Sequence, residues 1–247
     1  MKISIILNDI LIQYKSSKKF DEEKRLFCYK LYRPISFYLS AILIFFKIKP
    51  NKITLVNFVF MITSFIYFLK GAMFLGAFFL LMTFILDLSD GNMARYYNTN
   101  NSFGKLADGL VDSLIFITFF SYSVSLVIND RFIINEKMTL IIGAVTSLSM
   151  LFKTSFDLRC NWVLLRDEKR NEIKNFKKNF LHKDYNFFSF CKNLVNEIYL
   201  ALPIILILSI YLDYPEISLI FYFFVIFFIS NFEILLKLYL IWKKFNK

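Results

Sequence analysis

Cysteine and histidine are scarce in this sequence, and their scarcity argues against several classes of site. The 247 residues include three cysteines, Cys28, Cys160 and Cys191, which are far apart, odd in number and never arranged as CxxC. That pattern supports neither a disulfide framework nor a zinc site. The one histidine, His182, stands in a lysine-rich loop, so we do not expect a histidine-based metal centre.

The sequence also has no recognisable signal peptide, internal repeat or low-complexity linker. Its N-terminal region carries charges of both signs, and no small-residue cleavage site follows an apolar run. We therefore expect a cytoplasmic N-terminal segment over residues 1–50 and one transmembrane domain over residues 51–247.

Apolar side chains are what the chain has in abundance, with 57% hydrophobic residues and 32 phenylalanines. Long apolar runs separated by polar turns predict an all-α fold, a polytopic helical membrane bundle. The apolar stretch 34–48 is short for a span and is flanked by Arg33 and Lys49, which predicts an interfacial amphipathic helix lying on the membrane. We expect six transmembrane helices at about 52–69, 72–95, 104–128, 138–158, 194–212 and 217–241.

The net charge of +11 lies mainly between the apolar runs. We interpret it as topology and attraction to anionic membrane lipids, and we expect no nucleic-acid partner. With six spans, both termini, the 96–103 loop and the 159–193 segment share the side that carries most lysines and arginines. The positive-inside rule then predicts a multi-pass protein with cytoplasmic termini.

Carboxylates interrupt the second predicted span near its end. Asp87, Asp90, Gly91 and Ala94 follow the spacing i, i+3, i+4 and i+7, which places them on one helical face. Arg95 comes directly after them. Isolated charges in an apolar helix are costly, so such residues are usually kept for binding or chemistry.

The third predicted span begins with a matching set. Gly104, Asp108 and Asp112 are spaced i, i+4 and i+8, again close to one face. The short connection predicts that the two helices are antiparallel neighbours whose acidic faces meet, at the cytoplasmic side of the membrane.

Four neighbouring carboxylates repel one another unless a cation lies among them. Hard oxygen ligands without histidine or cysteine suit Mg²⁺, Mn²⁺ or Ca²⁺. Gly91 and Gly104 leave room for a large ligand, and Arg95 supplies a fork for phosphate oxygens. The combination suggests phosphoryl-type transfer from a pyrophosphate donor.

Other interpretations remain open at this stage. The aspartates could be solvated helix ends paired with nearby lysines. They could also form the ion path of a cation transporter, although they lie near one surface and no interrupted helices occur at matching positions of two halves. An inactive scaffold is a third interpretation, which the intact set of residues disfavours. Metal-dependent release of a nucleotide would separate an enzyme from the last two.

These residues resemble the CDP-alcohol phosphotransferase family, whose signature is D-x2-D-G-x2-A-R-x8-G-x3-D-x3-D. The signature is long and specific, and every fixed position is matched within residues 87–112. The resemblance implies a CDP-linked donor, often CDP-diacylglycerol or else another CDP-alcohol, and an alcohol acceptor, with CMP as the leaving group. It places the enzyme in phospholipid biosynthesis with membrane lipids as its surroundings, and homodimers are common among its members.

The resemblance also implies roles for individual residues. Asp112 would be the catalytic general base on the acceptor hydroxyl. Asn51 and Thr54 fit the Pro-Asn-x-x-Thr pattern that family members often carry, which implies nucleotide contacts. Lys153 is a candidate for an acceptor phosphate, although a lysine that snorkels to the membrane surface is the simpler interpretation. The ligands of Mg²⁺ or Mn²⁺ would be Asp87, Asp90, Asp108 and Asp112, and the CDP moiety would contact Gly91, Ala94, Arg95 and Gly104.

Overall fold

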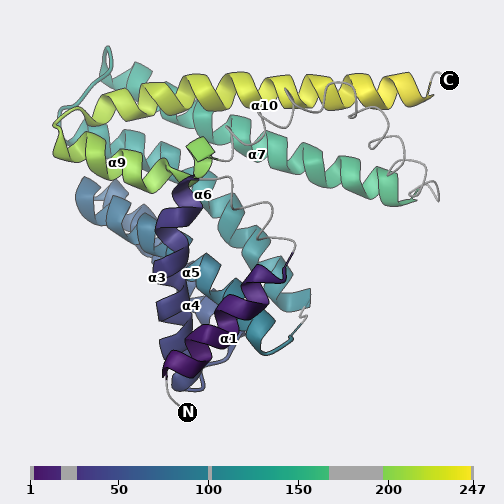
Figure 1. Cartoon of the computed structure of the whole chain (residues 1–247). Coiled ribbons are helices and arrows are strands. Elements are labelled where there is room, and N and C mark those ends of the chain that lie inside the picture. The colour runs from purple at the N-terminus through teal and green to yellow at the C-terminus, as the bar shows by residue number, and fades with distance from the viewer. Residues whose placement is uncertain (1–2, 18–26, 100–101, 167–196, 246–247) are drawn as a thin grey trace.

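The protein is all-helical, as the sequence predicts. The computed structural model describes residues 3–17, 27–99, 102–166 and 197–245, apart from some side chains inside α6, α7 and α10, and no strand occurs in these ranges. The helices are α1 (Ile3–Lys15), α3 (Phe27–Phe45), α4 (Pro50–Leu69), α5 (Met73–Tyr96), α6 (Ser102–Ile128), α7 (Glu136–Arg166), α9 (Leu202–Tyr211) and α10 (Pro215–Phe245) (Figure 1).

Three stretches of the described chain are long and apolar enough to cross a membrane. They are α4, α5 and the Glu136–Phe156 part of α7. Shorter apolar stretches occupy Ser113–Ile128, Leu202–Tyr211 and Pro215–Phe228. Six helices therefore follow the predicted order, but only three meet the length and apolarity that a span requires.

The helix boundaries differ from the predicted ones at the two ends of the chain. The sequence missed α1, and α3 covers Phe27–Phe45 where 34–48 was predicted. The helix predicted at 194–212 is divided, because a turn at Ala201 separates a helical piece at 197–200 from the 10 residues of α9. Helix α7 runs on to Arg166, past the predicted end at 158.

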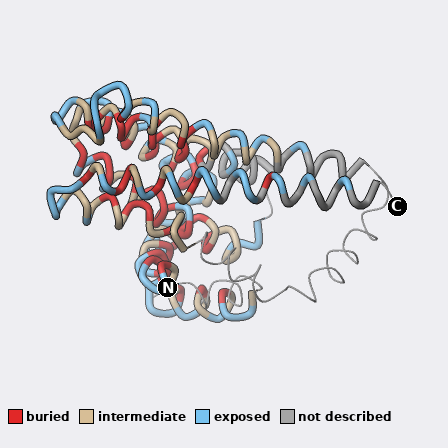
Figure 2. Tube along the Cα trace, turned by 90° about the horizontal axis from the view of Figure 1, so that it is seen from above, coloured by how far each residue is buried: buried red, intermediate tan, exposed pale blue. Residues whose placement is uncertain are grey.

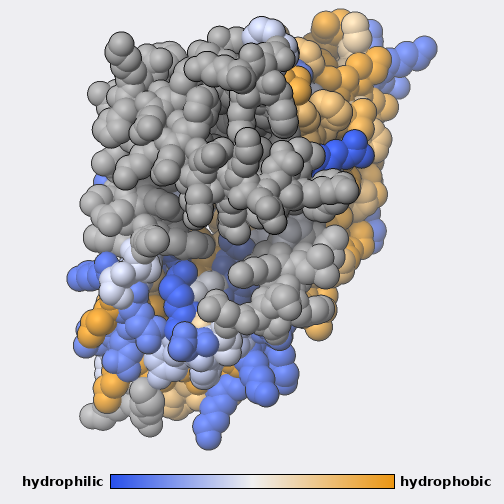
Figure 3. All heavy atoms as spheres, turned by 90° about the vertical axis from the view of Figure 1, so that its right-hand side faces the viewer, coloured by the Kyte–Doolittle hydropathy of each residue, from blue (hydrophilic) through white to orange (hydrophobic). Residues whose placement is uncertain are grey.

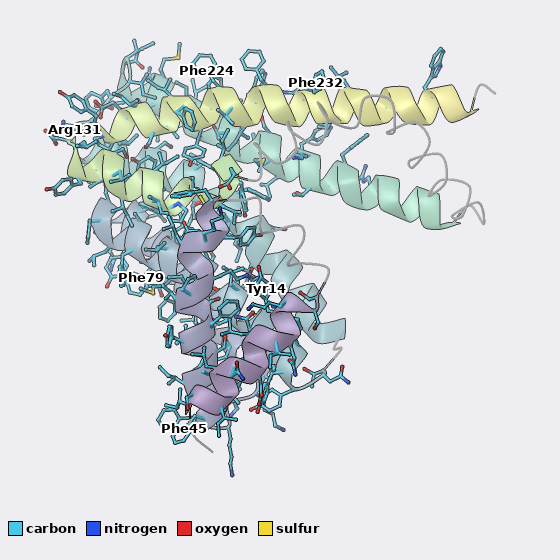
Figure 4. All side chains as sticks on the ribbon, viewed as in Figure 1. Tyr14, Phe45, Phe79, Arg131, Phe224 and Phe232 are labelled. Carbon is cyan, nitrogen blue, oxygen red and sulfur yellow. The ribbon has the colours of Figure 1, made fainter. Side chains whose placement is uncertain are left out.

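Three interhelical turns meet at one end of the molecule. The side-chain amide of Asn129, in the α6–α7 turn, donates to the backbone oxygen of Gly71, in the α4–α5 turn, at 2.8 Å. Arg131 forms an ion pair with Asp213, in the α9–α10 turn. Figure 4 labels Arg131 at this end. The three helix pairs therefore turn back at the same end, as in a bundle of hairpins.

Helix α3 is apolar on its exposed side and polar on part of its buried side. Its exposed stripe recurs at helical spacing, whereas Arg33, Ser36 and Ser40 are buried on the opposite face. In Figure 1, α3 runs across the direction of α7, α9 and α10. This distribution suits a helix that lies at a membrane surface rather than in water. The exposed stripe consists of Phe27, Leu31, Ile35, Tyr38, Ile42 and Phe45.

Buried residues follow the inward faces of the helices, and the described part of α10 beyond Phe228 is mostly exposed (Figure 2). Small residues allow the helices to approach closely. A Cβ added at Gly143 of α7 would overlap Ser123 of α6 and would lie 3.0 Å from the backbone oxygen of Phe119. Such close approach at a glycine is typical of helix packing in membrane proteins.

Candidate functional site

The candidate site begins where the apolar face of α5 gives way to carboxylates. Asp87 and Asp90 are one turn apart, but their surroundings differ: Asp87 is exposed and Asp90 is buried with 7% of its surface accessible. A buried carboxylate needs hydrogen-bond donors or a cation to offset its lost hydration. The fold supplies the first of these donors from the neighbouring helix α4.

Thr54 of α4 donates a hydrogen bond to Oδ2 of Asp90 at 3.0 Å. The threonine is itself buried, and the backbone oxygen of Pro50 is a more distant acceptor at 3.4 Å. The sequence predicts Thr54 as a nucleotide contact, and the structure places it against Asp90. The hydroxyl therefore fixes one oxygen of the carboxylate, as outer partners of metal ligands do.

A cavity of about 300 Å³ opens beside Asp87. The remainder of its lining is mainly aliphatic and aromatic, from α3, α5, α6 and the segment that precedes α9. A mostly apolar pocket with one carboxylate suits a ligand that has both a polar and a hydrocarbon part. The lining residues are Tyr29, Thr83, Phe84, Asp87, Leu88, Val111, Ile115, Tyr199 and Leu200.

Helix α6 contributes Val111 and Ile115 to this cavity. By their spacing, positions 108, 111, 112 and 115 share one helical face. Gly104 and the side chains of Asp108 and Asp112 lie outside what the structure describes. The predicted meeting of four carboxylates therefore remains a prediction, and only Asp87 and Asp90 are placed.

The carboxylates of Asp87 and Asp90 are of the type that binds a hard divalent cation. No group of three potential metal-ligating side chains occurs among the described residues, however. Carboxylate oxygens are the ligands that Mg²⁺ and Mn²⁺ prefer. A further oxygen lies on α4: Oδ1 of Asn57 is buried with no hydrogen-bond partner in the described structure. Asn57 follows Thr54 by one turn and is 1% exposed. The sequence analysis missed it, although its i+3 spacing from Thr54 was a usable signal.

Arg95 lies next to Gly91 on α5. A Cβ added at Gly91 would lie 3.8 and 3.9 Å from the two terminal nitrogens of Arg95, so the guanidinium lies along the glycine face of the helix. Arg95 and Ala94 are both half-buried. The structure thus places the guanidinium of Arg95 beside Gly91 on the same face of α5.

A buried amide next to the signature residues is the clearest feature that the sequence analysis missed. Oδ1 of Asn92 accepts hydrogen bonds from Arg95 at 2.7 Å and from Arg33 of α3 at 2.9 Å. The position is variable in the signature, so the motif gave no reason to select it. Only the packing of α3 against α5 reveals its contacts.

The other predicted site residues stay predictions. Asn51 is exposed in the first turn of α4, and Lys153 is half-buried in α7. Their suggested roles at the nucleotide and at an acceptor phosphate are therefore untested by the fold.

Comparison with known families gives a match over part of the chain. Residues 47–164 match the model of the CDP-alcohol phosphatidyltransferase family, a stretch that extends from the start of α4 into α7. This stretch contains Thr54, Asp90 and Arg95. No curated protein sequence matches the chain.

Proposed function

Since residues 47–164 match the model of the CDP-alcohol phosphatidyltransferase family, we propose that this chain is an integral membrane phosphotransferase. It moves a substituted phosphate group from a CDP-linked donor to an alcohol acceptor and releases CMP. CDP-diacylglycerol is the donor that we favour, which places the reaction in phospholipid biosynthesis. The observation that carries the proposal is the buried Asp90, held by Thr54 one turn from Asp87.

The charged signature residues have distinct parts in the proposed reaction. A divalent cation, Mg²⁺ or Mn²⁺, held by Asp87, Asp90, Asp108 and Asp112 would neutralise the charge of the pyrophosphate and of the departing CMP. The guanidinium of Arg95, beside Gly91, binds a phosphate of the donor. Asp112 accepts the proton of the acceptor hydroxyl as its oxygen attacks the donor phosphorus.

The cavity beside Asp87 supports a lipid as one of the substrates. Its lining contains Phe84, Leu88, Val111 and Ile115, whose apolar side chains form no hydrogen bonds with a polar ligand. They suit the hydrocarbon part of a substrate whose polar end reaches Asp87. A lipid-linked CDP donor has both parts in one molecule.

We propose further that the six predicted spans cross the membrane and that α3 lies on its cytoplasmic surface. The exposed apolar stripe of α3 supports this placement. Figure 3 views the molecule from the right-hand side of Figure 1, and hydrophilic residues gather in its lower part, at the height of α1. The three interhelical turns lie at the left-hand side of Figure 1, on the far side of the view in Figure 3. The signature residues of α5 would then face the cytoplasm.

The direct experiment measures CMP release by the purified protein from CDP-diacylglycerol, with Mg²⁺ or Mn²⁺ and a panel of alcohols. We expect release that requires both the cation and one class of acceptor. The control is Asp112→Asn, which keeps the size of the side chain and removes its basicity, and which we expect to abolish release. Cation transport without CMP release, by contrast, would support the transporter interpretation.

A further inference from the structure

Asn92 connects two arginines that come from different helices. Its Oδ1 accepts from Nη1 of Arg33 at 2.9 Å and from Nη2 of Arg95 at 2.7 Å. Its Nδ2 donates to the hydroxyls of Ser36 at 3.2 Å and Ser40 at 3.3 Å. The side chain is 1% exposed, so these contacts account for all its polar atoms in a place that water does not reach.

The surrounding hydrogen bonds fix which way the amide points. Ser36 donates its hydroxyl proton to the backbone oxygen of Arg33 at 2.9 Å, and Ser40 donates to the backbone oxygen of Ser36 at 2.6 Å. Both hydroxyl oxygens are thus left as acceptors facing Asn92, and only an amide nitrogen can satisfy them. Oδ1 must then face the two guanidinium groups.

Arg33 is enclosed by aromatic rings and is 4% exposed. Its guanidinium carbon lies 4.8 Å from the ring centre of Tyr14 on α1, and 5.7 and 6.0 Å from those of Tyr29 and Phe37 on α3. Figure 4 labels Tyr14 towards the C-terminal end of α1, and its ring packs against Phe37 of α3 with the ring centres 5.1 Å apart. Arg33 is therefore buried as a structural cation, and its contact with Asn92 holds the amide in place.

Arg95 is the partner that remains accessible. It is half-buried, and its fork lies along Gly91. We propose that Asn92 is a positioning residue, which aims the guanidinium of Arg95 at the diphosphate of the CDP-linked donor. Helices α1 and α3 thereby support the site through Arg33, although they contribute no signature residue. The identity of the ligand in this inference rests on the proposed function. The hydrogen bond from Arg95 to Asn92 is independent of that function, because the structure contains it.

A double-mutant cycle tests whether Asn92 acts through Arg95. CMP binding in the presence of Mg²⁺ is measured by titration calorimetry on the full chain in detergent, for Asn92→Leu, Arg95→Met and the double variant. We expect Asn92→Leu to weaken CMP binding about 10-fold alone and to have no further effect when Arg95 is already replaced. Asn92→Asp keeps an acceptor oxygen and should restore most of the affinity. Asn231→Leu, the same substitution at an exposed position of α10, serves as the matched control.

A second measurement needs no nucleotide. Modification of Arg95 by phenylglyoxal is followed by mass spectrometry, and we expect several-fold faster modification in Asn92→Leu than in the wild type or in Asn92→Asp. Unchanged modification, or additive effects on CMP binding, would overturn the positioning role. Faster modification in a protein whose wild type binds no CMP would retain the positioning role and reject the proposed function.

Discussion

At the scale of single residues, the polar groups of α5 are held by partners from α3 and α4. Thr54 reaches Asp90 from α4, and Ser36 and Ser40 reach Asn92 from α3. The spacing of Asp87 and Asp90 could be predicted from the sequence, because one helix sets it. The contacts of Thr54 and Asn92 could not, because they depend on how separate helices pack.

The hydroxyl of Thr54 gives a first prediction. Thr54→Val preserves the shape of the side chain but removes the donor to Asp90, so we expect about 10-fold weaker affinity for Mg²⁺, seen as a higher Mg²⁺ concentration for half-maximal CMP release. Thr54→Ser retains a hydroxyl and should behave like the wild type. Equal Mg²⁺ dependence in the valine variant would show that the Thr54 hydroxyl does not support metal binding.

Cys28 gives a second prediction at this scale. Burial, aided by a hydrogen bond to Glu197 and by the charge of that carboxylate, raises the pKa of the Cys28 thiol from 9.0 to about 12. Only about one thiol in 10,000 is then ionised at pH 8, and the thiolate is the reactive form. We expect alkylation of Cys28 by iodoacetamide, followed by mass spectrometry, to be far slower in the folded protein than in the denatured chain.

The raised pKa of Cys28 also determines how the stability of the folded protein changes with pH. The folded protein favours the neutral thiol, so this contribution to stability is present below pH 9 and is lost as the pH rises from about 9 towards 12. Glu197→Gln removes the neighbouring charge and should speed the alkylation. Rapid alkylation of Cys28 in the native wild-type protein at pH 8 would contradict the raised pKa of its thiol.

At the scale of elements, hydrophobic runs predicted where helices occur better than where they end. The polar face of α3 lies inward, against Ser89 and Asn92 of α5, so its apolar face is the exposed one. The prediction of an interfacial helix at 34–48 used the apolar run and its flanking basic residues, and it omitted residues 27–33, where polar side chains have buried partners. Helix α1 was missed because Ile6, Ile10 and Tyr14 form only a short apolar stripe.

The crossing of α6 and α7 gives a prediction for an element. Gly143→Ala would place a methyl group against Ser123 and 3.0 Å from the backbone oxygen of Phe119, so the two helices must move apart. We expect a loss of about 1–3 kcal/mol in stability, measured as a lower thermal midpoint in detergent. Gly109→Ala on α6 is the matched control, since its added methyl group meets nothing within 4 Å. Equal midpoints would argue that α6 and α7 do not pack as described.

At the scale of the whole molecule, two ends are distinct in structure. One end gathers the turns around Gly71, Asn129 and Asp213, and the Asp90-containing part of α5 lies towards the other. The sequence predicted this hairpin order because apolar runs alternate with polar turns. The sequence could not predict that the three turns lie close together, because this depends on contacts between turns such as the ion pair of Arg131 with Asp213.

Labelling from one side of the membrane tests the proposed orientation. In a chain whose native cysteines are replaced by serine, Tyr214→Cys lies in the turn before α10, and Thr99→Cys lies after α5; both positions are exposed. We expect a membrane-impermeant maleimide to label Tyr214→Cys in intact cells and Thr99→Cys only after permeabilisation. The reverse pattern would place the signature residues of α5 outside the cell.

The central claim is transfer to an alcohol, and one isotope measurement tests it directly. The purified protein is incubated in H₂¹⁸O with CDP-diacylglycerol, Mg²⁺ and the accepted alcohol. The masses of the lipid products are then measured by mass spectrometry. The account predicts one phosphodiester per CMP released, free of ¹⁸O, because the acceptor oxygen forms the new bond to phosphorus as the bond to CMP breaks. Phosphatidate carrying ¹⁸O, formed in proportion to CMP, would show that water is the acceptor and would contradict the account.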